Sequence, residues 1–298
     1  MAEIAVPRAR SQGIVRVKDL RDFLSVFAQR KVAVFGAAII LLLVAVAVFA
    51  GPIAPYDPYK QNLRAALQPP SHVHLLGTDP LGRDVFSRII YGTRTSLAVG
   101  LISVGLGSLI GMSLGMLAGY RGGVVDALIM RFVDAMMSIP SLMLALAVGV
   151  ALGGGLSNVI IALGFALIPV YTRLMRGQVM VVKEEEYILA AKALGASHGR
   201  IMLRHIFPNT LPPLIVLVTL NLGVAILAEA GLSFLGLGIA PPGAAWGAMV
   251  SDGYRYLGTN PVLSLAPGTC IILVVLAVNF FGDGIRDALD PRLRRRHR

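Results

Sequence analysis

The chain has 298 residues, of which 56% are apolar and only 14% are charged. Soluble domains carry about 25% charged residues, so this composition indicates an integral membrane protein and excludes a disordered chain. The formal net charge of +11, from 27 Lys and Arg against 16 Asp and Glu, would elsewhere suggest a nucleic-acid partner. The single cysteine, Cys270, excludes a disulfide framework within the chain.

Six apolar runs are long enough to cross a bilayer, which takes about 20 residues. The first run carries no charge and is too long for a cleavable signal peptide, so we expect it to be a retained helix. The sequence therefore predicts an all-α integral membrane protein with six transmembrane helices. The six runs are 32–54, 95–118, 132–152, 156–172, 211–228 and 262–282.

The basic residues predict the topology, because Lys and Arg in short flanks oppose translocation. Four alternate segments hold 21 of the 27 basic residues: the tail 1–31, segment 119–131, the loop 173–210 and the C-terminal segment. Both termini are therefore predicted to lie in the cytoplasm, and the protein itself in the plasma (inner) membrane. Charges spread over four membrane edges favour contact with anionic lipid, and we expect no nucleic-acid partner.

The same pattern divides the chain into regions. Asp79 and Pro80 suggest an N-cap and a first helical residue, with Asp84 and Arg88 paired one turn apart, which predicts a short interfacial helix before the second span. The predicted regions are a cytoplasmic tail at 1–31, the first helix at 32–54, an extracytoplasmic loop at 55–92, a five-helix transmembrane domain at 93–283 and a basic cytoplasmic tail at 284–298.

Two local signals concern helix packing. Small residues at four-residue intervals in the second span let a neighbouring helix approach closely, and we expect tight packing within the fold. Pro140 and Pro169 are expected to kink or break their helices. The small residues are Gly107, Gly111, Gly115 and Gly119.

Motifs for catalysis or nucleotide binding are missing from the sequence. It contains no Gly-Lys pair and hence no P-loop, so any ATP and Mg²⁺ must be bound by partner subunits. We predict no catalytic, cofactor or metal site, and treat His72 and His74 as ordinary loop residues. Glu229 is the one convincing acid near an apolar run, and Asp134 is expected to pair with Arg131. A chain of buried carboxylates is lacking, which disfavours a stand-alone secondary transporter.

The loop 173–210 has the pattern of a helix-turn-helix elbow. Three acids open its first helix, Gly195 ends that helix in a turn, and Ser197 can cap a second helix. Ile201, Leu203 and Ile206 are expected to give the second helix an apolar side, until Pro208 stops it. A thin elbow of small residues suits a groove on a partner protein, although an ordinary cytoplasmic hairpin would show similar capping.

This loop resembles the motif of permease subunits of binding-protein-dependent ABC importers, E-A-A-x-x-x-G followed by I-x-L-P. Ala190, Ala191, Gly195 and Pro208 match it, while Leu189 stands in place of the motif's Glu and Phe207 in place of its Leu. Further strings are similar to the C-type permeases of dipeptide, oligopeptide and nickel importers. These are APYDP at 54–58, LGTD at 76–79, AGYRGGVVD at 118–126, LSFLGLG at 232–238, WG at 246–247 and GDGIRDALDP at 282–291.

The resemblance implies a type I ABC importer fold, a homologous second permease, two ATPase subunits and an extracytoplasmic binding protein. It implies transport of di- or oligopeptides, with nickel or another small solute as the alternative cargo, and it names no residue of the substrate path. The residues that it places at the contact with an ATPase subunit are Glu185, Glu186, Ala190, Ala191, Gly195, Ala196, Ser197, Arg200 and Pro208.

Overall fold

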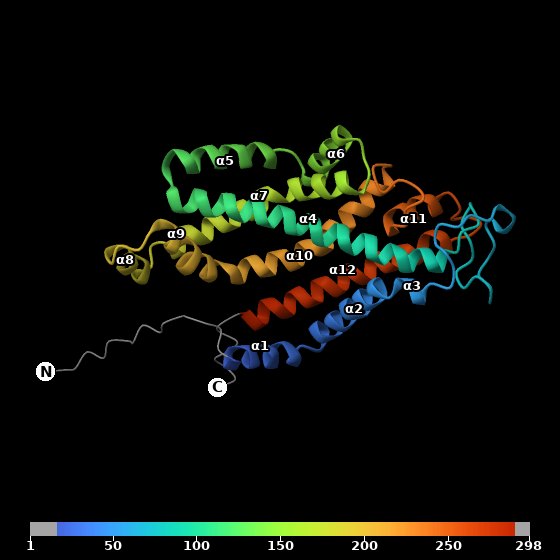
Figure 1. The fold of residues 1–298 in the computed structure, drawn as a ribbon, viewed down its shortest axis with the longest axis horizontal. Helices are drawn as coiled ribbons and strands as arrows, with labels where there is room; N and C mark the ends of the chain where they lie inside the picture. The colour runs from blue at the N-terminus through green and yellow to red at the C-terminus, as the bar shows by residue number, and fades with distance from the viewer. Residues whose placement is uncertain (1–16, 290–298) are drawn as a thin grey trace.

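Residues 17–289 are described by a computed structural model, in which long helices run side by side along one axis (Figure 1). Much of the two predicted tails, residues 1–16 and 290–298, lies outside this range. The long helices are α2 (Lys31–Val48), α4 (Val85–Arg121), α7 (Leu156–Val182), α10 (Phe207–Phe234) and α12 (Val262–Leu289). The shorter ones are α1 (Val17–Gln29), α3 (Ala50–Ile53), α5 (Gly123–Met137), α6 (Ser141–Leu152), α8 (Glu186–Ala193), α9 (His198–Arg200) and α11 (Trp246–Tyr254).

The described range contains five helices that are long and apolar enough to cross a membrane, or six if α5 and α6 together make one bent span. The all-helical prediction is confirmed at this level. Several helices extend beyond the apolar runs, and α7 continues to Val182 where the run ended at 172. Met175 and Val179, in this added part, are fully buried, so packing against neighbouring helices extends the helix past the apolar stretch.

The third predicted span, 132–152, is not one continuous helix. It is divided between α5 and α6, which meet at an angle of 90°, and α5 already begins at Gly123. Pro140 stands directly before α6, with φ −52° and ψ 134°, outside the helical region. Proline has no N–H to donate and restricts the residue before it, so the predicted break at this position is confirmed. Pro169, by contrast, lies inside α7, which continues through it.

Two ion pairs attach α5 to α7. The Arg176 side chain donates two hydrogen bonds to the carboxylate of Asp126, at 2.5 and 2.6 Å. Asp134 accepts a hydrogen bond from Arg173 at 2.6 Å. The expected Arg131 partner of Asp134 was therefore wrong, because a cation on a neighbouring helix reaches this carboxylate more directly than one on the same helix.

The glycine stripe is the seam between α4 and α7, the most extensive helix pair in the described structure. A Cβ placed on Gly111 would lie 2.6 Å from the Ile168 carbonyl oxygen, and one on Gly115 would lie 2.4 Å from that of Thr172. Gly107 and Gly119 face α7 backbone in the same way. The predicted tight packing within the fold is confirmed, with α7 as the partner.

The loop between α3 and α4 corrects the predicted interfacial helix. Asp84, not Asp79, is the N-cap, since its Oδ2 accepts a hydrogen bond from the Ser87 N–H at 2.8 Å, and α4 then runs without interruption into the membrane span. The expected pair between Asp84 and Arg88 does not form. Asp84 instead contacts His74 at 2.9 Å, while Arg88 faces Asp79 at 3.5 Å.

The two ends of the bundle differ in what they carry (Figure 1). The loop 54–84 and α11 lie at one end. The start of α1, the end of α12, the junction of α4 with α5, and the elbow of α8 and α9 lie at the other end. Within residues 17–289, the described parts of the segments rich in basic residues therefore lie at one end of the bundle.

The α4–α7 seam yields a matched pair of substitutions on one helix. Gly111→Val would place methyl groups against α7 backbone and cost about 1–3 kcal/mol, whereas a Cβ on Gly105 meets nothing within 4 Å. We expect Gly111→Val to lower the Tm of the detergent-purified complex by on the order of 5 °C and Gly105→Val to leave it unchanged, as followed by thermal unfolding. Equal Tm values for the two variants would contradict the assignment of the seam.

Candidate functional site

The elbow between α7 and α10 projects beyond the end of the bundle (Figure 1). Its first helix, α8, starts with Glu186 in the first turn, directly after Glu184 and Glu185. These carboxylates stabilise the positive end of the helix dipole. The pKa of the Tyr187 phenol is raised by partial desolvation and by the negative charge of Glu185.

The predicted turn at Gly195 is confirmed. Gly195 has φ +76°, a conformation that favours glycine because it has no Cβ. The Ala196 N–H donates to the Ala191 carbonyl and the Gly195 N–H to that of Lys192, both at 3.0 Å. This is the Schellman arrangement, which satisfies the last carbonyls of α8 and reverses the chain.

The second helix of the elbow begins as predicted and ends differently. Ser197 caps α9 by accepting a hydrogen bond from the Arg200 N–H at 3.4 Å. Pro208 does not stop the helix: a wider π-helical segment, Ile201–Ile206, connects α9 to α10, and Pro208 lies in the first turn of α10. The wider turn accommodates the proline, whose ring and missing N–H conflict with regular α-helical bonding to the preceding turn.

The inner face of the elbow is anchored in the bundle. Ile188 of α8 and Ile201 and Ile206 of the π-helical segment are fully buried against Met175 and Val179 of α7. The predicted apolar side is therefore confirmed for the two isoleucines of the second helix. It is wrong for Leu203, which is 72% exposed because the wider turn directs it away from the core.

The outer face of the elbow exposes apolar and charged side chains together. Leu194 is 88% exposed, and Leu189, at the position of the motif's Glu, is half exposed. A thin helix with exposed leucines, outside the apolar spans, presents a surface suited to another protein. Of the residues predicted for the contact, Ala191 and Ala196 are half-buried, and the exposed ones are Glu185, Glu186, Ala190, Gly195, Ser197, Arg200 and Pro208.

Two contacts that the sequence analysis missed connect the elbow to α4. The Tyr120 hydroxyl and His198 Nδ1 lie 2.8 Å apart in a hydrogen bond, and the Lys183 ammonium donates to the Gly119 carbonyl at 3.1 Å. Tyr120 and His198 are 78 residues apart, and no sequence pattern signals such a pair. The elbow is thus attached to α4 as well as to its own flanking helices.

The opposite end is held by polar contacts of Arg88. This buried guanidinium donates to the carbonyls of Pro58, Pro242 and Gly243 at 3.0, 3.4 and 3.3 Å. It therefore connects the loop before α4 to the loop before α11. Burying a charged group is costly unless it is hydrogen-bonded, so these contacts are a strong constraint on both loops.

Other residues singled out in the sequence also lie at this end. Glu229 is buried and accepts a hydrogen bond from the Ser233 hydroxyl at 2.7 Å. His74 is engaged by Asp84. No group of three or more metal-ligating side chains occurs in the described part of the chain.

The bundle, its broken third span and its projecting elbow define a membrane permease of the ABC importer class. Residues 111–295 match the family described as "Binding-protein-dependent transport system inner membrane component". Residues 20–70 match "N-terminal TM domain of oligopeptide transport permease C". The chain belongs to the binding-protein-dependent permease family and is a multi-pass protein of the inner membrane.

Curated relatives are similar over almost their whole length. The "Dipeptide transport system permease protein DppC" of Alkalihalophilus pseudofirmus is 43% identical over 93% of this chain and 91% of its own. The "Probable D,D-dipeptide transport system permease protein DdpC" of Escherichia coli is 46% identical over 87% of each. The "Glutathione transport system permease protein GsiD" of Pectobacterium atrosepticum is 42% identical over 94% of this chain and 95% of its own.

Solved structures support the fold. Two chains from inward-facing structures of the MetNI methionine ABC transporter are each 22% identical to this chain, with TM-scores of 0.53 and 0.56. The matches cover 68% and 69% of this chain and 96% and 97% of the solved chains. The helical core therefore has the fold of these transporter chains.

The elbow turn gives a second matched test. Gly195→Ala places a Cβ in the left-handed region, at a cost of about 1–2 kcal/mol. Gly199, four residues on, lies in α9 with open space around it and a helical conformation. We expect Gly195→Ala to accelerate amide exchange across 186–200 by roughly 5- to 30-fold, and Gly199→Ala to leave it unchanged or slower. Unchanged exchange in both variants would show that the turn does not depend on glycine.

Proposed function

We propose that this chain is a permease subunit of an ATP-driven importer for di- or oligopeptides. The relatives are named for dipeptides, D,D-dipeptides and glutathione, and glutathione is itself a tripeptide. Nickel was the alternative cargo, and these names favour peptides over it. The observation that carries the coupled mechanism is the elbow, which is anchored by buried isoleucines on one face and exposes leucines on the other.

The exposed face of the elbow is the contact with an ATPase subunit in this proposal. Leu189 and Leu194 supply apolar contact, and Glu186 and Arg200 supply charge. An apolar side chain in place of the motif's Glu suits a groove with an apolar floor. The elbow, both termini and the basic segments then face the cytoplasm, in accordance with the positive-inside rule.

The remaining partners follow from the same proposal. A homologous second permease completes the membrane path, and two ATPase subunits bind the ATP and Mg²⁺ that this chain, without a P-loop, has no motif to bind. An extracytoplasmic binding protein delivers the peptide to the end formed by the loop 54–84 and α11. Anionic lipid surrounds the basic edges, and nucleic acid has no role.

The mechanism rests on differential binding. Closure of the ATPases around ATP favours one arrangement of the two permeases, and hydrolysis of the ATP removes this bias, so that the permeases return to the other arrangement. The elbow transmits it through its buried isoleucines to α7 and α10, and through the contact of His198 with Tyr120 to α4. These helices pack closely, so a displacement at the elbow shifts them together and turns the path outward or inward.

The proposal is tested with the full complex in proteoliposomes, including the binding protein. We expect Leu194→Asp to lower both peptide uptake and binding-protein-stimulated ATP hydrolysis by at least about tenfold, since 1.4 kcal/mol lost at the contact already gives that factor. Leu194→Met keeps an apolar side chain of similar volume and should behave as the wild type.

Two results would contradict the proposal. Full uptake by the Leu194→Asp complex would remove the elbow from the coupling contact. Uptake by this chain without ATPase subunits, driven by a proton or ion gradient, would make it a secondary transporter.

A further inference from the structure

A polar cavity opens at the end of the bundle opposite the elbow. It has a volume of about 540 Å³ and lies between the α6–α7 connection, the loop that follows α10, and α11. Small-molecule sites are typically about 300–1,000 Å³, so the cavity has the size of a binding site. Its charged and hydroxyl side chains are Arg83, Arg88, Ser233, Ser251, Asp252 and Arg255.

Glycine forms one wall of the cavity. Gly153, Gly154 and Gly155 adopt φ values of +89°, +71° and +89°, a run that L side chains rarely adopt. A Cβ on Gly153 or Gly155 would meet no atom within 4 Å, so close packing does not require glycine at either position. The backbone conformation is what requires it, and the result is a wall without side chains beside the charged groups.

The charged groups of the cavity fall into two kinds. Arg83 and Arg88 are buried and already engaged with Asp79, at 2.6 and 3.5 Å. Asp252 of α11 and Arg255, the residue directly after this helix, are exposed, and their side chains have no hydrogen bond or ion pair to any other residue in the range 17–289. Among the charged side chains of the cavity, these two therefore have hydrogen-bonding capacity left for a ligand.

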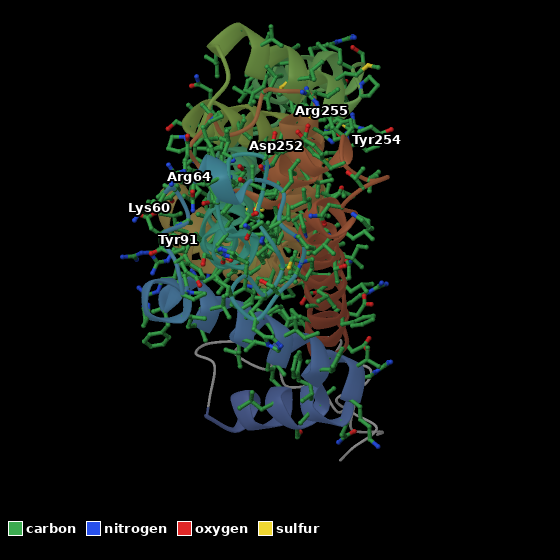
Figure 2. All side chains as sticks on the ribbon, turned by 90° about the vertical axis from the view of Figure 1, so that its right-hand side faces the viewer. Lys60, Arg64, Tyr91, Asp252, Tyr254 and Arg255 are labelled. Atoms are coloured by element: carbon green, nitrogen blue, oxygen red, sulfur yellow. The ribbon has the colours of Figure 1, made fainter. Side chains whose placement is uncertain are left out.

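The view onto this end shows Asp252 and Arg255 on the same side of the molecule (Figure 2). Lys60 and Arg64 lie apart from them, over the loop before α4. Arg255 follows Asp252 by three residues and, directly after α11, keeps a right-handed helical backbone conformation. Residues at that spacing on a helix have Cβ atoms about 5–6 Å apart. The Asp252 carboxylate and the Arg255 guanidinium thus lie near each other at the edge of one cavity.

This pair is complementary to the two ends of a short peptide. At neutral pH a peptide carries an ammonium and a carboxylate, and two extended residues span at most about 7 Å. A guanidinium binds a carboxylate through two parallel hydrogen bonds, and a carboxylate binds an ammonium. The apolar part of the lining, which includes Phe234, Leu235 and Ile239, accepts peptide side chains without selecting one.

The electrostatics of Asp252 agree with this reading. Although the residue reaches solvent, the protein atoms around the cavity partly desolvate its carboxylate and raise its pKa. Arg88, Arg83 and Arg255 oppose this rise, and Asp79 adds to it. Its carboxylate is thus less stabilised than a solvated one. An ammonium group bound beside it would favour the charged form.

We propose that this cavity is a binding site for short zwitterionic peptides entering the membrane path, with Asp252 holding the peptide ammonium and Arg255 its carboxylate. The inference rests on the proposed function, since it presupposes peptide transport. It adds a second site of substrate selection, within the permease, which recognises the terminal ammonium and carboxylate of the peptide and not its side chains.

The test uses the complete complex in proteoliposomes, with the binding protein saturated with radiolabelled alanyl-alanine. We expect Asp252→Asn and Arg255→Gln each to lower peptide uptake per ATP hydrolysed by at least fivefold, while hydrolysis stimulated by the loaded binding protein stays within twofold of wild type. Lys60→Gln and Arg64→Gln remove charges at the same end that do not line the cavity. Any effect of theirs on docking of the binding protein changes hydrolysis and uptake together, so uptake per ATP hydrolysed should not change.

A blocked peptide separates recognition from a structural role. We expect the wild-type complex to import alanyl-alanine amide less well than the free acid, after correction for its separately measured affinity for the binding protein. Arg255→Gln should import the two equally, because the carboxylate no longer has its partner. Asp252→Asn should still prefer the free acid.

The outcomes are distinguishable from those of the proposed function. A wild-type complex that hydrolyses ATP and imports no peptide would overturn the substrate class, and this inference with it. Peptide import by the wild type together with unaltered uptake in both cavity variants would overturn the binding site alone. The same loss of uptake in the Lys60 and Arg64 variants would also overturn it, because the effect would then be one of surface charge.

Discussion

The contact on which the rest of the structure depends is the direct packing of α4 on α7 along four glycines. Lipid tails are as apolar as the helices, so little hydrophobic force drives helices together inside a bilayer, and close backbone approach with van der Waals packing does this instead. Gly111 and Gly115 leave no room for even one carbon atom between them and the α7 backbone. The two helices therefore behave as one rigid pair.

Both functional ends are built on this pair. α7 leads into the elbow at one end, and the first turn of α4 carries Arg88, which connects the loops at the other end. The Tyr120–His198 contact returns from the elbow to α4, so the elbow is attached to both members of the pair. Closely packed helices therefore connect the elbow to the opposite end, and in the proposed mechanism a displacement at the elbow is carried along them.

Short-range features of the elbow could be predicted from the sequence, since each depends on a few neighbouring residues. Gly195 in the left-handed turn and Ser197 as a cap are examples. The partners of the charged residues could not be predicted in this way. Asp134 pairs with Arg173 and Arg88 faces Asp79, in place of the nearer residues on the same helix that spacing suggested. A charge at a helix surface takes the best-placed partner in space, and sequence spacing identifies only candidates within one helix.

The sequence by itself determined the membrane class, the apolar runs, the alternation of basic segments and the glycine stripe, because hydrophobic length, charge and residue size act locally. Only the tertiary structure decided which helix the stripe meets, that the π-helical segment continues through Pro208, and which charges remain free. Asp252 and Arg255 are ordinary charged residues in the sequence. They become candidate binding residues only because segments distant in the chain come together in the fold and enclose a cavity beside them.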